Sequence, residues 1–344
     1  MEGVNGSIRS PVYLGYQHDA NIGVTQRETG DMGIGTFATR HFSAGSLIFA
    51  ERPLLIVPHN NPTSWDVAIL QAYNQLSENE KVVYQGLGCN RRAAEYQVAT
   101  QRDGPSVSVL DYSDVDGMPN DTTLDGPARI AGIYHTNSFD LKIEYGASAV
   151  FTRLSRINHS CVPNVVAGGL CGKTGLFYLR TLRDIKAGEE LFFGYSQYMG
   201  PYEARRRSFP FECQCALCSK PSKTSSDRRR LDIANFVSQL TDYISKIVVG
   251  QQTECCDAVA LKLANSYLER VRDEDLYEFI PWGYQALAFT QLKNGLRDEA
   301  EQSINTAETY ERMYWGHQAK STEVFWDYYC KTVVEAVRIE NGEI

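Results

Sequence analysis

Three cysteines lie close together in the stretch FECQCALC, residues 211–218 of the chain. Cys213, Cys215 and Cys218 form a C-x-C-x2-C pattern, and three thiols this close together are unusual as ordinary packing residues. Structural zinc takes four tetrahedral ligands, so the pattern predicts a metal site that needs one more ligand from elsewhere in the chain. The chain has nine cysteines, and this odd number favours reduced thiols and a metal site over a disulfide framework.

The heptad NHSCVPN, residues 158–164, offers the fourth ligand. Cys161 is the first candidate, because a four-thiolate site there would attach the cysteine-rich segment to the body of the domain. Cys171, which also lies beside a turn, is the chief alternative. Taken alone, the heptad is also compatible with an ordinary turn or with a nucleophilic cysteine. A thiolate enclosed in a four-sulfur zinc site is not a free nucleophile, so a zinc role for Cys161 argues against a cysteine–histidine protease.

Composition places the chain among ordinary globular proteins. Its 344 residues, 43% hydrophobic and 22% charged, suffice for one large or two medium domains. No apolar run reaches the roughly 18 to 20 residues of a membrane helix, and the opening residues lack the layout of a signal peptide. We therefore expect an intracellular protein, in the cytoplasm, the nucleus or both, that does not bind membranes.

The charge pattern argues against direct nucleic-acid binding. The formal net charge is -8, whereas phosphate contacts require concentrated lysine and arginine. Two short basic runs, Arg205–Arg207 and Arg228–Arg230, are interpreted as solvated helix faces or junctions.

Most of the first half of the chain has the pattern of short strands. Glycines and turn residues separate β-type residues between residues 31 and 58, and Leu47–Val57 reads as an apolar strand pair closed by Pro58. Further short strands are predicted at residues 149–153, 165–167, 175–180 and 190–193.

A helical insertion is predicted within this β-rich part, at about residues 64–126. Its first helix starts near Ser64, and Ser77 with Glu80 forms a capping box that starts a second helix. Residues 102–127 lack a regular spacing of hydrophobic residues and are predicted to form a long loop. A further helix is expected from Ala128 to about Phe139.

The polar stretch SKPSKTSSDRRR, residues 219–230, is predicted to be a domain boundary, after which every pattern is helical. Apolar residues at helical spacing predict helices at 233–247 and 261–271, with Gly250 ending the first. Residues 284–314 read as two antiparallel helices joined at Asn294–Gly295, in the style of one tetratricopeptide hairpin or of a plain helical bundle.

With these motifs in place, the sequence resembles the SET-domain lysine methyltransferases, in particular fungal proteins related to the SET- and MYND-domain subfamily. The resemblance is carried by five pieces in the family's order: GIG at 33–35, NSF at 137–139, RINHSCVPN at 156–164, AGEELFFGY at 187–195 and FECQCALC at 211–218. It covers roughly residues 18–218. The only cysteine between Glu51 and Arg129 is Cys89, so no MYND zinc finger is expected.

The resemblance implies an α+β protein in two domains. Residues 18–218 would form a mainly-β SET fold with a pseudoknot, the helical insertion and a zinc-bound post-SET segment. Residues 226–340 would form a helical, tetratricopeptide-like domain. Cys161, Cys213, Cys215 and Cys218 would hold the structural zinc. The expected partners are a lysine-bearing protein substrate and a protein bound by the C-terminal helices.

The resemblance also implies an S-adenosylmethionine site. The residues expected to contact this cofactor are Met32, Gly33, Ile34, Asn137, Asn158, His159, Tyr195 and Phe211. Tyr195 resembles the catalytic tyrosine, whose hydroxyl orients the methyl group and the attacking amine. On this interpretation His159 faces the cofactor and Cys161 faces zinc, so the two side chains are not chemical partners.

Two local departures limit the transfer of function. An acidic residue commonly follows the catalytic tyrosine, whereas this chain has Tyr195-Ser196-Gln197, and Met32 and Ile34 stand where a polar or basic residue is frequent. The favoured function is methyl transfer to a lysine of a histone or other protein. The alternatives are a catalytically weak SET-like scaffold that recruits partners through its helices, and a methyltransferase acting on another kind of acceptor. The sequence leaves the substrate, the number of methyl groups and the oligomeric state open.

Overall fold

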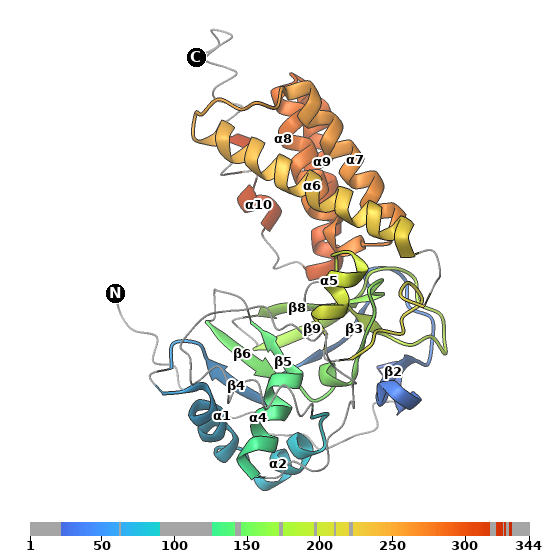
Figure 1. Cartoon of the computed structure of the whole chain (residues 1–344), viewed down its shortest axis with the longest axis vertical. Coiled ribbons are helices and arrows are strands. Elements are labelled where there is room, and N and C mark those ends of the chain that lie inside the picture. The colour runs from blue at the N-terminus through green and yellow to red at the C-terminus, as the bar shows by residue number, and fades with distance from the viewer. Residues whose placement is uncertain are drawn as a thin grey trace.

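The computed structural model describes residues 22–61, 63–89, 126–141, 146–171, 175–195, 198–209, 211–219, 223–316, 321–325, 327, 330 and 331. Figure 1 shows the strands and helices α1, α2 and α4 in one half and helices α6 to α9 bundled in the other, with α5 between them. The chain is thus α+β, with a β-rich part followed by a helical part, as expected. No helix among the described residues is long and apolar enough to cross a membrane.

The β-rich part is built from small sheets. Strands β1 (Val24–Glu28) and β2 (Ile34–Ala38) form an antiparallel hairpin. A second sheet has the strand order β3-β9-β8, formed by β3 (Leu47–Glu51), β9 (Leu176–Thr181) and β8 (Val165–Cys171). A third sheet has the order β4-β6-β5, formed by β4 (Leu55–Pro58), β6 (Ala147–Val150) and β5 (Ser138–Asp140). The predicted strands at 47–58 exist, but they do not pair with each other, because β3 pairs with β9 and β4 with β6.

A fourth sheet joins two segments far apart in the sequence. Strand β7 (Asn158–His159) runs parallel to β10 (Phe192–Phe193), with Asn158 opposite Phe192 and His159 opposite Phe193. Both strands are only two residues long, so their register depends on contacts outside the strands, which are described with the site below.

The helical insertion has its own small core. It contains α1 (Trp65–Asn74), α2 (Glu78–Gln85) and α4 (Gly126–Asn137), which bury Ile69, Tyr84 and Ile133 against one another. The predicted capping box is confirmed, since the Ser77 hydroxyl accepts from the Glu80 N–H and Glu80 accepts from the Ser77 N–H. Of the predicted long loop, residues 102–125 lie outside the described part.

The remaining α-helices among the described residues are α5 (Tyr202–Arg207), α6 (Lys223–Val248), α7 (Asp257–Asp273), α8 (Ile280–Lys293), α9 (Arg297–Trp315) and α10 (Ser321–Phe325). Short 3-10 turns occur at Gly30–Met32, Leu154–Arg156 and Tyr277–Phe279. Gly250 follows α6, and α8 and α9 pack together across a turn at Asn294–Gly295, as predicted. The tetratricopeptide character of this pair stays a prediction.

The interpretation of the two basic runs as solvated was wrong for one arginine in each. Arg205 in α5 and Arg230 in α6 are each only 1% exposed. Within the polar stretch 219–230, α6 begins at Lys223 and Ser226 is buried as well, and the domain boundary there stays a prediction. These polar residues are buried because they pair with one another and with distant partners.

The end of α9 packs on the β3-β9-β8 sheet. The Trp315 ring covers Gly168 of β8 so closely that a Cβ there would lie 2.5 Å from the ring, and Met313 covers Gly45 in the same way. Tyr314 is buried with Val166 and Leu182. The helical part therefore rests directly on the β-rich part (Figure 1).

Candidate functional site

The segments 158–164 and 190–195 are held together by more than the two-residue strands. Ser160 N–H donates to Phe193 O (3.2 Å) and Asn164 N–H to Phe192 O (3.0 Å). The Asn164 side chain is buried, donates to Glu190 O (2.8 Å) and accepts from Phe192 N–H (2.7 Å). Asn164 therefore does more than form a turn. Its amide fixes the register between segments 158–164 and 190–195, whose crossing would form the predicted pseudoknot.

The start of this crossing is fixed by Glu51 at the end of β3. Its carboxylate accepts hydrogen bonds from the N–H groups of Arg153 (2.8 Å) and Leu154 (3.1 Å), at the start of the 3-10 turn that leads into β7. Burial raises the pKa of Glu51 to about 7, against the lowering effect of these hydrogen bonds. Glu51 therefore anchors the approach to Asn158 and His159.

Tyr195 follows β10 and turns back onto β7. Its N–H donates to His159 Nδ1 (3.0 Å), and its hydroxyl donates to Ile157 O (3.1 Å). Burial raises the pKa of Tyr195 above its ordinary value, so the phenol stays protonated at neutral pH. The predicted catalytic tyrosine is therefore oriented at both ends and is a hydrogen-bonding group, not a base.

Aromatic rings surround Tyr195. The ring of Phe193 lies 4.9 Å from Tyr195, and Phe211 meets Tyr195 edge-on at 6.2 Å. Phe209 stacks on Phe211 with centroids 5.4 Å apart and an interplanar angle of 13°, and it lies 4.2 Å from His159. These five residues form an aromatic cluster that unites the three motifs in which they occur.

The glycine motif joins the same site from β2. A Cβ on Gly35 would collide with Glu190 Oε1 and would lie 3.0 Å from Asn158 Nδ2. Asn158 itself donates to Glu190 Oε1 (2.9 Å). Gly35 is therefore required by a close approach, and the segments around residues 35, 158 and 190 meet at one point.

The other predicted cofactor residues occupy two different places. Gly33 has φ +73° and ψ -134°, a conformation that favours glycine, and Met32 beside it is 38% exposed. Ile34 begins β2. Asn137 is at the end of α4, where its amide donates to Gly88 O and Ile133 O, each at 2.7 Å. Asn137 thus has contacts within the helical insertion, and its role toward a cofactor stays a prediction.

The four cysteines predicted to bind zinc come together. The sulfur atoms of Cys161, Cys213, Cys215 and Cys218 all lie within 4.8 Å of one another. Cys161 Sγ is 3.7 Å from Cys218 Sγ and 3.9 Å from Cys213 Sγ. Sulfurs bound to one tetrahedral zinc at about 2.3 Å are roughly 3.8 Å apart, whereas disulfide sulfurs are about 2.05 Å apart. The donor set therefore fits zinc. The side chain of the alternative ligand, Cys171, lies outside the described part.

The pKa values of the four thiols move in different directions. Hydrogen bonds with the other three cysteines raise the pKa of Cys161; for Cys213, the hydrogen bond with Cys161 lowers the pKa, but those with Cys215 and Cys218 raise it overall. Hydrogen bonds from Cys161 and Cys213 lower the pKa of Cys218 to about 7, and they lower the pKa of Cys215 as well. Burial lowers the pKa of His159 to about 3, so its imidazole is neutral at pH 7. Because His159 Nδ1 accepts from Tyr195, the ring proton is on Nε2.

The expectation that His159 and Cys161 are not partners was wrong. His159 Nε2 lies 3.3 Å from Cys161 Sγ, within hydrogen-bonding distance for sulfur. His159 therefore connects the Tyr195 backbone to the sulfur cluster through its two ring nitrogens. A contact between its side chain and a cofactor would have to use the ring face, since both nitrogens are engaged.

Sequence reasoning did not single out several of these residues. Glu190 and Phe193 were quoted only as part of the AGEELFFGY motif, and Phe209 lies just before the FECQCALC motif. The signal for the two phenylalanines was their position, since each lies two residues before a predicted site residue, and Glu190 lies within the AGEELFFGY motif. The buried Arg205 and Arg230 had no such signal, because an arginine run gives no sign of burial.

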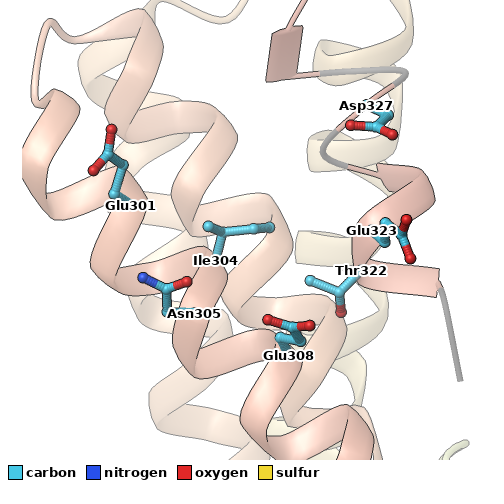
Figure 2. A pocket seen from close by; sticks show the side chains of 7 residues that line it. All are labelled: Glu301, Ile304, Asn305, Glu308, Thr322, Glu323 and Asp327. Carbon is cyan, nitrogen blue, oxygen red and sulfur yellow. The ribbon is translucent and has the colours of Figure 1, made fainter. Parts of the chain in front are cut away.

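A separate hollow of about 340 Å³ lies beside α9 and α10. Four of its seven lining side chains are the carboxylates Glu301, Glu308, Glu323 and Asp327, which Figure 2 shows on α9 and on the segment around α10. None of the residues around Tyr195 or the sulfur cluster lines it. A group of acidic residues alone does not define a ligand, so we assign it no function.

Comparison with known proteins agrees with the sequence resemblance. Residues 33–196 match the SET domain family. A putative SET domain-containing protein, L678, from Acanthamoeba polyphaga mimivirus is 29% identical over 195 residues, which are 54% of this chain and 73% of the viral protein. N-lysine methyltransferase SMYD2 from Homo sapiens is 34% identical over 98 residues, 27% of this chain and 21% of SMYD2.

The extent of these matches differs from one relative to another. The chain spans only about a fifth of the length of SMYD2. The crystal structure titled as the SET domain of LSMT bound to lysine and AdoHcy aligns over 94% of this chain and 89% of that chain, with 11% identity. Its TM-score is 0.36, so this likeness carries no argument. The two sequence relatives come from a virus and a vertebrate, and the fungal affinity stays a prediction.

Proposed function

The chain carries a SET domain over residues 33–196, and from this premise we propose that it is an S-adenosylmethionine-dependent protein-lysine N-methyltransferase. The observation that carries the proposal is the placement of Tyr195. Its hydroxyl is oriented on Ile157 O within the aromatic cluster, and its backbone is tied to His159. Lysine methylation is a proposal for this chain, because the sequence match covers only about a fifth of the curated lysine methyltransferase.

The chain's own residues suit the cofactor's shape. The stacked rings of Phe209 and Phe211 suit a flat adenine, and Phe211 is only half-buried, so part of its surface is open. Met32, Gly33, Ile34, Asn137, Asn158 and His159 are the further proposed contacts. When bound, S-adenosylmethionine supplies a methyl group on a sulfonium sulfur and leaves as the neutral thioether.

Methyl transfer requires the protein mainly to align the methyl group with the lysine nitrogen and to keep that amine neutral. A lysine nitrogen forms the new bond to carbon with its lone pair, the carbon–sulfur bond breaks, and the nitrogen then loses a proton to water. The apolar ring of Phe193 beside Tyr195 disfavours a charged ammonium and so lowers the pKa of an entering lysine. Tyr195, which stays a neutral phenol, positions the amine without removing its proton.

The proposed substrate is a lysine-bearing segment of a histone or other protein. The net charge of -8 favours approach of a cationic segment through long-range attraction. The four-sulfur cluster is proposed to hold a structural zinc that fixes the segment carrying Phe211 beside Tyr195. No contact among the described residues favours a purely scaffolding role, so that alternative is not retained.

Replacement of Tyr195 by phenylalanine tests the proposal. We expect Tyr195→Phe to lower transfer of labelled methyl groups from S-adenosylmethionine to extract proteins by about 100-fold, because the ring stays but the orienting hydroxyl is lost. Tyr84→Phe is a matched control, since the buried Tyr84 hydroxyl also donates to a backbone carbonyl, Ile130 O at 2.8 Å. Equal activity of the two variants would contradict the role of Tyr195.

A further inference from the structure

Two buried arginines flank the four-sulfur cluster. Arg205 Nη2 donates to Cys218 Sγ (3.7 Å), and Arg205 Nη1 donates to Gly200 O (2.6 Å). Arg230 Nη2 donates to Cys161 O (2.9 Å), and its Nη1 donates to Tyr198 O (2.6 Å). Each guanidinium thus contacts the cluster, one at a sulfur and one at the backbone of a sulfur-bearing residue.

Both arginines are held by carboxylates of the helical part. Asp227 in α6 lies 3.5 Å from Arg205 Nη1. Glu274, which follows α7 and is buried, accepts from Arg230 Nε (2.8 Å) and from the Ser226 hydroxyl (2.5 Å). Breaking a buried ion pair by removing one partner leaves an uncompensated charge, so Arg230 depends on Glu274 for its position.

The charges of the arginines match the need of a metal site. A zinc ion with four thiolates carries a net charge of about -2, and burying that charge is unfavourable unless cations or N–H donors surround it. Arg205, Arg230 and the Nε2–H of His159 supply such groups. Partners of this kind around metal ligands orient the ligands and raise metal affinity.

We propose that Arg205 and Arg230 are positioning residues for the four-sulfur site, and that Glu274 makes zinc affinity depend on the helical part of the chain. This inference rests on the proposed zinc site but not on methyl transfer. The helical part would then contribute to the metal site, because Glu274, just after α7, holds Arg230, and Arg230 orients Cys161.

The first test uses the full-length protein loaded with zinc and a chromophoric chelator in equilibrium competition. Glu274→Gln keeps the shape of the side chain and removes its charge. We expect it to weaken zinc affinity by about 10- to 100-fold. Glu311→Gln is the matched control, because Glu311 is also buried in the helical part and accepts from Thr322 N–H (2.8 Å), away from the cluster. That variant is expected to bind zinc as the wild type does.

A second series separates charge at the cluster from simple packing. Arg205→Met removes the cation and is expected to weaken zinc affinity, again by about tenfold or more, whereas Arg205→Lys restores part of it. Arg206→Met is the control, since Arg206 is the exposed neighbour in the same helix. If Glu274→Gln does not yield folded protein, Ser226→Ala removes one hydrogen bond to Glu274 and one from Arg230 Nε (3.3 Å), and it is expected to shift affinity in the same direction.

The outcomes are distinguishable. Unchanged zinc affinity in Glu274→Gln and Arg205→Met, with zinc present in the wild type, would overturn this inference and leave the proposed metal site intact. Equal weakening by Glu311→Gln would also overturn it, since the effect would then follow general destabilisation. A wild-type protein that binds no zinc would refute the metal site itself, and this inference with it.

Discussion

Gly35, Asn158 and Glu190 show how closely the site is packed at the scale of single residues. Asn158 Nδ2 donates to Glu190 Oε1 at 2.9 Å, and Gly35 leaves just enough room for this pair. Burial raises the pKa of Glu190, while its hydrogen bond with Asn158 acts in the opposite direction. The three residues come from three separate motifs, so their contact fixes the relative position of β2, β7 and the segment before β10.

An added methyl group at Gly35 should therefore separate the three motifs. We expect Gly35→Ala to cost about 1 to 3 kcal/mol of folding free energy, because the new Cβ overlaps Glu190. Binding of S-adenosylmethionine, measured by calorimetry, should weaken with it. Gly86→Ala is the control, since its Cβ would make ordinary contacts, the nearest at 3.4 Å, and its φ of -77° suits alanine. Equal behaviour of both variants would contradict this account.

Helix α4 illustrates an effect at the scale of one element. His135 near its C-terminal end has a buried Nε2 with no hydrogen-bond partner among the described residues. Burial lowers the pKa of His135 to about 4, although the charge of Asp66 acts in the opposite direction. The unfolded chain takes up a proton on this residue near pH 6.5, and the folded chain does so only near pH 4.

This difference predicts acid sensitivity of the helical insertion. A depressed pKa contributes stability that is fully present above pH 6.5 and is lost as the pH falls toward 4. We expect the loss to reach at most about 3 kcal/mol, and His135→Asn to abolish it. Denaturant titrations of both proteins at several pH values between 7 and 4 measure the effect. A constant difference between them across this range would contradict the assignment.

The elements themselves were largely predictable, because they depend on local patterns. Ser77 and Glu80 start α2 through contacts three residues apart, and Gly250 ends α6 in the same local way. Strand pairing was not predictable, since β3 and β4 are neighbours in sequence but pair with β9 and β6.

Burial of polar residues was not predictable either. Arg230 is buried because Glu274, which is 44 residues away, accepts from it. Of the candidate site, the grouping of the four cysteines follows from motifs that the sequence displays, whereas the hydrogen bond between Tyr195 N–H and His159 was not predicted. The contact of His159 with Cys161 depends on side-chain geometry that the sequence does not reveal.

At the scale of the whole molecule, the β-rich and helical parts share buried contacts at two places. Arg230 links α6 and Glu274 to the backbones of Cys161 and Tyr198, and the Tyr198 hydroxyl donates to Glu278. At the second place, Trp315 and Met313 cover glycines beside the β3-β9-β8 sheet. The two parts are thus expected to unfold together.

Zinc removal should consequently destabilise the entire chain. A bound metal stabilises the folded state by about 4 kcal/mol when its free concentration is 1,000 times the Kd, so a strong chelator should lower the Tm markedly. We expect circular dichroism in the far and near ultraviolet to report one coincident transition before and after chelation. Two separate transitions, with only one sensitive to the chelator, would show that the helical part is independent of the metal site.

The central claim is methyl transfer from S-adenosylmethionine to a lysine side chain. Its most direct measurement is to incubate the purified chain with labelled cofactor and extract proteins, and then to identify the labelled amino acid after complete acid hydrolysis. We expect label in methylated lysine, with little in a parallel reaction with Tyr195→Phe. Label found only in other amino acids, or no protein label despite measurable cofactor binding, would contradict it.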